Sequence, residues 1–183
     1  SGLSGTITFL SGETDEEQVL ITRAVIAAFE KENPGVQAEA FEHNTQKIEQ
    51  MLLKDQIDFG LVEGTVTSPE IIAKPFLKDR LVLICSVGHR FSQCPRVEPE
   101  ALTKERWIVR EAGSGTRKTF EDAMAARGIP WQPFWVCNDS DTIKKAVRAG
   151  IGVSVISELA VTDELEYGVL ITRQIEGMPF QRE

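Results

Sequence analysis

The sequence predicts an α/β protein built as two lobes, each with a mostly parallel sheet. Short apolar runs alternate along the chain with stretches in which apolar residues recur at helical spacing, which is typical of parallel sheets covered by helices. The pattern occurs twice, before and after about residue 80, and divides the 183 residues into lobes 1–79 and 80–183. A chain of this length accommodates one large domain or two small lobes.

The first series has clear boundaries. Pro34-Gly35 ends a helix whose inner face carries Ile21, Val25 and Phe29 at helical spacing. We expect strand 6–10, a helix ending near 33, strand 36–41, a helix capped by Asn44 or Thr45, and a buried strand at 57–62.

The second series repeats this order after two apolar runs, 71–76 and 81–86, and a proline-containing loop, 92–99, that we expect at the surface. We then expect strand 106–110, helix 116–127, strand 134–137, a short helix capped within 138–141, strand 151–156, helix 158–166 and strand 169–173.

The most informative stretch, residues 110–117, reads Arg-Glu-Ala-Gly-Ser-Gly-Thr-Arg and joins an expected strand to an expected helix. Its glycines allow a sharp turn and close approach to the backbone, and Ser114 or Thr116 is a good first residue for a helix. A helix start presents unpaired N–H groups that attract anions. The stretch therefore predicts an anion-binding loop, although a capped strand–helix connection accounts for the same residues.

Polar turns also follow the other strands. In open α/β sheets, ligands bind beyond the carboxyl ends of the strands, so these turns predict a cleft between the lobes for a small polar molecule. The candidate ligand-binding residues are Ser11, Thr14, Asn44, Glu63, Thr65, Arg110, Ser114, Gly115, Thr116, Asn138, Ser140 and Asp141. For Glu63, an exposed turn acid is the alternative.

Composition excludes several classes of function. The net charge of −8 and a pI near 4.9 argue against nucleic-acid binding by this part alone, which needs a basic face. No apolar run approaches the ~18 residues of a membrane helix, and residues 1–5 do not resemble a signal peptide. Three scattered cysteines favour a reduced, cytoplasmic protein.

The sequence gives little support for a catalytic site or a metal site. His43 and His89 fall in different lobes and have no evident nucleophile as a partner. The segment 113–115 lacks the spacing of a G-x-S-x-G nucleophile elbow, and no Cys/His cluster has metal-ligand spacing. We expect no enzyme activity, no metal and no cofactor.

A family resemblance covers the whole chain through motifs in a fixed order. Residues 29–36 resemble F-x-x-x-x-P-x-V, residues 57–64 resemble D-x-x-[LF]-x-E-G, residues 110–117 resemble R-E-x-G-S-G-T-R, and residues 143–154 resemble I-K-x-A-V-x-x-G-x-G-I-S. The chain is similar to the effector-binding domain of LysR-type transcriptional regulators. At 88–91, Arg90 replaces the proline of the family's G-H-P-L.

The resemblance implies two Rossmann-like lobes of the periplasmic-binding-protein type 2 kind, with a small-molecule effector in the cleft. It also implies a DNA-binding winged helix-turn-helix outside this chain, a cytoplasmic homodimer or higher oligomer that pairs through helices 18–33 and 116–127, and a first lobe completed by chain beyond Glu183. The alternative is a transporter's solute-binding protein of the same fold.

One segment departs from the family pattern. Residues 11–17 are two residues longer than the family's S-x-T-I-G turn and carry four acids. Acids complement a helix start, but they also repel an anion, so we expect an anionic effector to rely on the second lobe.

Overall fold

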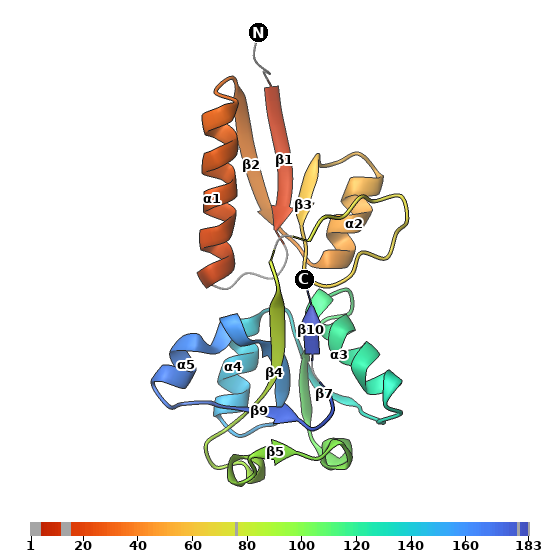
Figure 1. Ribbon diagram of the computed structural model, residues 1–183, viewed down its shortest axis with the longest axis vertical. Helices are drawn as coiled ribbons and strands as arrows, with labels where there is room; N and C mark the ends of the chain where they lie inside the picture. The colour runs from red at the N-terminus through yellow and green to blue at the C-terminus, as the bar shows by residue number, and fades with distance from the viewer. Residues whose placement is uncertain (1–4, 12–15, 76, 179, 183) are drawn as a thin grey trace.

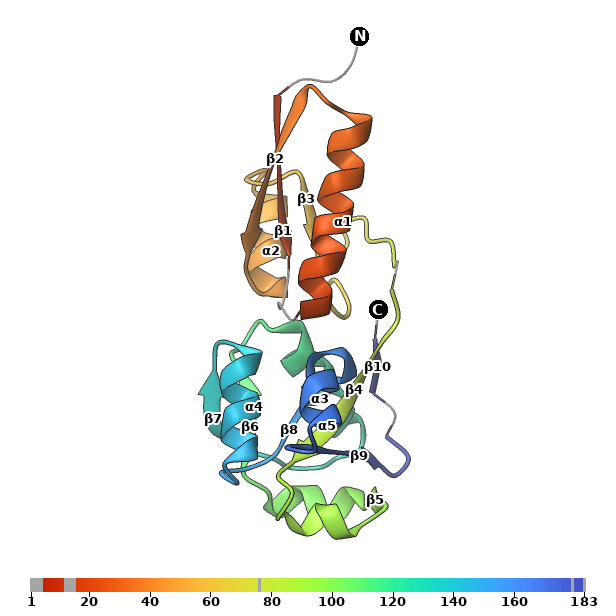
Figure 2. The ribbon, with the colours of Figure 1, turned by 90° about the vertical axis from the view of Figure 1, so that its left-hand side faces the viewer.

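The computed structural model describes residues 5–11, 16–75, 77–178 and 180–182, which form two lobes stacked end to end (Figure 1). The first lobe has a parallel sheet in the order β2-β1-β3. Its strands are β1 (Gly5–Ser11), β2 (Val36–Glu42) and β3 (Phe59–Leu61). Helices α1 (Glu16–Glu32) and α2 (Thr45–Leu53) lie on opposite sides of this sheet (Figures 1 and 2).

The second lobe is centred on β4 (Asp79–Cys85), which pairs antiparallel with β8 (Ser154–Ser157), β9 (Ile171–Ile175) and β10 (Phe180–Arg182). The expectation of a mostly parallel sheet is therefore wrong for this lobe. Strand β4 leaves the first lobe and runs away from it, so the strands that return beside it run in the opposite direction (Figure 1).

Strands β6 (Trp107–Arg110) and β7 (Pro133–Cys137) pair in parallel, and a bridge from Trp107 to Val153 connects them to the segment before β8. The remaining elements are β5 (Arg96–Val97), α3 (Gly115–Ala126), α4 (Ser140–Arg148), α5 (Thr162–Glu166) and the 3-10 helices Arg90–Gln93, Pro99–Lys104 and Glu158–Val161.

Alternation along β4 divides the core of the second lobe into two clusters. Leu81 and Leu83 face the cluster around Trp107 and Phe120, whereas Val82 and Ile84 face the cluster beneath α4. The Trp107 and Phe120 rings lie 4.6 Å apart. The described part of the first lobe has a much smaller cluster, with Ile48 and Ile57 as its buried members. The second lobe is therefore the better-packed platform for a site.

Two local expectations were wrong in part. The loop 92–99 lies largely at the surface as expected, but it contains β5, in which Val97 is buried and paired with Ile175 of β9. The strand expected at 57–62 is reduced to β3, in which Phe59 is exposed. No strand was expected for the run 71–76, and its described residues form none as the chain crosses between the lobes. In these segments, the strands available as pairing partners, rather than the local run of apolar residues, decide what forms a strand and what is buried.

Within the part of the chain that the structure describes, no helix combines the length and apolarity that crossing a membrane requires.

Candidate functional site

The glycine-rich loop folds as the sequence predicts. Strand β6 ends at Arg110, Gly113 has φ +95°, and α3 begins at Gly115. Ser114 is the N-cap residue, because its hydroxyl oxygen accepts a hydrogen bond of 3.2 Å from the backbone N–H of Arg117. A left-handed backbone favours glycine at position 113. The loop therefore places the N-terminus of α3 at the end of β6 that faces the first lobe.

The N-terminus of α2 lies directly opposite. Asn44 is its N-cap, and the Oδ1 atom accepts a hydrogen bond of 2.9 Å from the N–H of Lys47. The Nδ2 atom of the same amide donates to Oε2 of Glu111 across the interface, at 3.1 Å. The backbone N–H of Gln46 donates to the Gly113 carbonyl oxygen, also at 3.1 Å. Two hydrogen bonds thus join the two helix starts.

The glycines of the loop make this contact possible. A Cβ atom on Gly115 would lie 2.4 Å from the Glu63 carbonyl oxygen and 2.8 Å from Oγ1 of Thr45. A Cβ atom on Gly113 would lie 2.7 Å from Oε1 of Gln46. All three distances are shorter than real Cβ contacts allow. The glycines therefore allow the first lobe to pack directly against the loop.

A charged pair anchors the loop. The Arg110 side chain is 8% exposed and forms a bidentate pair with the next residue, with Nε 2.7 Å from Oε1 of Glu111 and Nη2 3.2 Å from Oε2. Burial raises the pKa of the Glu111 carboxyl, but hydrogen bonds from Arg110 and Asn44 outweigh burial and hold that pKa below its ordinary value. Glu111 is therefore held as a carboxylate between the lobes.

A second polar contact lies on the other side of the loop. Oγ1 of Thr116 donates to Oε2 of Glu63 at 3.4 Å, and Oγ1 of Thr45 donates to the Glu63 backbone carbonyl at 3.4 Å. Thr116 and Ser114 are both buried. The Glu63 carboxylate therefore lies beside the helix start that the sequence predicted as an anion site.

The third group of predicted residues follows β7. Arg110 and Cys137 are paired at the carboxyl ends of the parallel strands β6 and β7, so Asn138 and Ser140 lie just beyond the same end of this sheet. The N-cap residue of α4 is Asp139. The backbone N–H of Thr142 donates a hydrogen bond to its carboxylate and lowers its pKa, and this effect outweighs the slight burial of the group. The Thr142 hydroxyl and the charge of Arg110 lower the pKa further. Asp141 is exposed and faces Lys144, with Oδ1 3.6 Å from Nζ.

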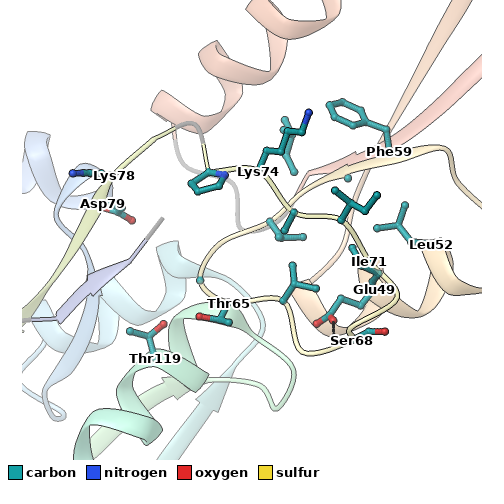
Figure 3. A pocket seen from close by; sticks show the side chains of 18 of the residues that line it. Glu49, Leu52, Phe59, Thr65, Ser68, Ile71, Lys74, Lys78, Asp79 and Thr119 are labelled. Atoms are coloured by element: carbon teal, nitrogen blue, oxygen red, sulfur yellow. Dashed lines mark hydrogen bonds between the residues drawn. The ribbon is translucent and has the colours of Figure 1, made fainter.

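Three predicted residues stand apart from this contact or cannot be described. Thr65 is exposed and lines a groove on another side of the interface, near Thr119 (Figure 3). Ser11 ends β1 in register with Glu42 and Leu61. Thr14 lies outside the described residues.

The groove in Figure 3 is large and largely apolar, with a volume of about 1940 Å³. Leu52, Phe59 and Ile71 line its first-lobe side, and Lys78 and Asp79 lie where the chain enters β4. Ile72, also on its wall, is 89% exposed. A ligand pocket buries most of a small molecule, so this open surface is a poor candidate for one.

Sequence reasoning missed four of the residues that make the contact between the lobes, namely Thr45, Gln46, Glu111 and Gly113. Glu111 follows a strand-end arginine, and a carboxylate there offers that arginine a partner. For Gln46, the only signal is its position in the first turn of a helix, where backbone N–H groups lack acceptors within the helix. The described residues contain no group of three or more His, Cys, Asp and Glu side chains placed to hold a metal ion.

Comparison with known proteins identifies the family. Residues 2–183 match the family model of the LysR substrate binding domain. The chain belongs to this family. It is 34% identical over 150 residues to the HTH-type transcriptional regulator YeiE of Escherichia coli K12, covering 82% of this chain and 51% of YeiE. It is 28% identical over 181 residues to a probable RuBisCO transcriptional regulator of Cyanophora paradoxa, covering 96% and 56% of the two chains.

Solved LysR regulatory domains share the fold. The Synechocystis PCC6803 CcmR regulatory domain, in complex with 2-PG, matches with a TM-score of 0.80 at 24% identity, covering 98% of this chain and 85% of that one. The effector-binding domain of QuiR, in complex with shikimate, matches with a TM-score of 0.79 at 15% identity, covering 99% and 88%. The expected α/β fold of two lobes, of the periplasmic-binding-protein type 2 kind, is confirmed.

These relatives are transcription regulators and not enzymes, which favours a regulator over the transporter's solute-binding protein. The LysR substrate-binding domain described here spans about half the length of the curated relatives that it matches.

Proposed function

We propose that this LysR substrate-binding domain senses a small polar or anionic metabolite at the loop 110–116, between the two lobes. One observation carries the proposal: the N-terminal ends of α2 and α3 meet across the interface, at the carboxyl ends of strands from both lobes. Two facing helix starts concentrate backbone N–H groups and positive potential. The hydroxyls of Ser114 and Thr116 and the guanidinium of Arg110 add donors.

The site residues fall into two groups under this proposal. An anionic group of the effector lies against 114–116 and Arg110. The polar remainder of the effector contacts the predicted positions that lie toward this loop, which are Asn44, Glu63, Asn138, Ser140 and Asp141. The net charge of −8 opposes long-range attraction of an anion, so the loop's short-range donors supply the affinity.

A thermal-shift panel tests this function. Sulfate, sulfite, thiosulfate, O-acetylserine and small dicarboxylates are added to the wild type, to Thr116→Val, and to Thr103→Val as the control. A ligand at ~100 times its dissociation constant stabilises the fold by about 2.7 kcal/mol, which raises the melting temperature by roughly 5–10 °C. Losing one donor to a charged ligand costs about 1.5–3 kcal/mol, so Thr116→Val loses most of the shift.

The control removes a hydroxyl that donates to the Glu100 carbonyl within a 3-10 helix of the second lobe. Thr103→Val should keep the full shift. A compound that stabilises the wild type and Thr116→Val equally would show that the loop is only a helix cap.

We further propose that the full-length protein is a cytoplasmic DNA-binding regulator and that its DNA-binding part precedes this domain. Because this domain has a net charge of −8, we expect that other part to make the contacts with nucleic acid. We expect effector occupancy to alter how two or more copies present their DNA-binding parts.

We propose homodimers formed side by side through α1 and α3. Strand β7, which follows α3 in the chain and pairs with β6, exposes three apolar residues in a row, Phe134, Trp135 and Val136. Contiguous exposed apolar residues mark interaction surfaces. Light scattering of the full-length protein at ~100 μM should give a dimer or larger. A monomer at that concentration would contradict the proposal.

We propose lobe boundaries of 1–79 and 80–183, with the groove beside β3 covered by chain that follows residue 183 in the full-length protein. The solved neighbours are longer than this chain, which covers 85% and 88% of them. Figure 1 shows β10 ending beside the first lobe and directed toward it. In the full-length protein, the amides of β3 should exchange more slowly than in residues 1–183. Equal exchange would contradict this covering.

A further inference from the structure

The contact between the lobes rests on an amide with two fixed roles. Asn44 uses its Oδ1 atom to cap α2, accepting from Lys47, and this fixes which side of the amide faces away from the helix. The Nδ2 atom therefore points to the second lobe, where it donates to Glu111 at 3.1 Å. The carboxylate that it meets is held in turn by Arg110. Neither partner of this bridge rotates away without losing a second interaction.

The bridge stands next to a backbone hydrogen bond that depends on the distance between the lobes. Gln46 is the second residue of α2, and N–H groups in the first turn have no acceptor within the helix. Its N–H donates instead to the Gly113 carbonyl of the other lobe. When the lobes separate at this loop, that N–H loses its acceptor. The Gln46 amide therefore reports on the contact directly.

We propose that the hydrogen bond from Asn44 to Glu111 is a latch that holds the glycine-rich loop of the second lobe against the N-terminus of α2. While it is closed, atoms of Thr45 and Glu63 fill the space beside Gly115. A molecule that enters between the loop and Thr45 has to open the latch. A role of the latch in effector sensing rests on the proposed function, but the hydrogen bond itself can be tested with no effector added.

The test reverses the polarity of the bridge. Asn44→Asp keeps the cap, because aspartate caps helices as well as asparagine does, but it sets a second carboxylate against Glu111. Adding Glu111→Gln restores a donor–acceptor pair. The introduced amide at 111 donates to the carboxylate at 44, and its oxygen still accepts from Arg110. A side chain that only fills space would gain nothing from this second substitution.

Hydrogen exchange of single amides, followed by NMR, gives the readout. In Asn44→Asp, the Gln46 amide should exchange about tenfold faster or more than in the wild type, and the double variant should recover most of that protection. The Lys47 amide, bonded to the cap itself, and the Val109 amide in β6 should stay protected in all three proteins, which shows that the fold is intact. Gln174→Glu, an exposed position in β9, controls for the added negative charge.

Two results would overturn the latch. One is Gln46 protection that Asn44→Asp leaves unchanged. The other is a double variant that exchanges at Gln46 as fast as the single variant while Lys47 and Val109 remain protected. Neither depends on any compound binding to the protein, so a failure of the proposed effector site in the thermal-shift panel is a separate result.

Discussion

Gly115 and the backbone carbonyl of Glu63 lie too close for any side chain between them, since a Cβ atom on Gly115 would sit 2.4 Å from that oxygen. The two residues belong to different lobes. The first residue of α3 therefore sets how closely the second lobe approaches the end of β3.

Gly115→Ala should destabilise the protein by about 1–3 kcal/mol, because the added methyl group forces backbone to move in a packed contact. Urea denaturation followed by circular dichroism measures the change. Gly88→Ala is the matched control, since a Cβ atom at Gly88 has no neighbour within 4 Å. If both variants unfold at the wild-type urea concentration, the lobes are not in firm contact at this position.

The loop illustrates how far sequence reasoning reached. The strand–turn–helix order and the cap at Ser114 follow from local chemistry, since glycine permits the turn and a hydroxyl satisfies the helix start. The partner of the loop does not follow from local chemistry. That Gly113 meets Gln46 depends on how the two lobes are placed, and no spacing along the chain encodes that placement.

Other elements show the same limit. Helix α4 was predictable from Ile143 and Val147 at helical spacing, and both are buried. The antiparallel pairing of β4 was not, because apolar runs look alike in parallel and antiparallel sheets when both faces are covered. Glu111 was within the motif, yet its contact with Asn44 spans the two lobes.

Glu63→Gln should tighten the binding of an anionic effector about tenfold, or ~1.4 kcal/mol, because it removes a negative charge beside Thr116 while keeping an oxygen that accepts from the hydroxyl. Isothermal titration with an anion that stabilises the wild type measures the change. Glu70→Gln, an exposed acid on the groove, should leave the affinity unchanged. Equal affinities for the wild type and Glu63→Gln would make Glu63 a simple turn acid.

Glu111 should make stability depend on pH. Its pKa in the folded protein is lowered from 4.5, so the ionised carboxyl adds stability that is fully present above its unfolded pKa and is lost as the pH falls through the lowered folded value. The free energy of unfolding of the wild type minus that of Glu111→Gln should therefore be constant above about pH 6 and shrink below about pH 4.5.

Urea titrations at a series of pH values give this difference. The lowered pKa of Asp139 acts in both proteins and largely cancels in the comparison. A difference that stays constant down to pH 3, or that grows on acidification, would contradict the arrangement of Glu111 between Arg110 and Asn44.

A crystal structure with the most stabilising compound of the panel shows whether the loop 110–116 receives the effector. We predict an anionic oxygen of that compound within about 3.2 Å of Oγ1 of Thr116 or of the first backbone N–H groups of α3. The same compound bound in the groove beside Phe59 and Ile72, with the loop still packed against Thr45, would show that the loop is not the effector site.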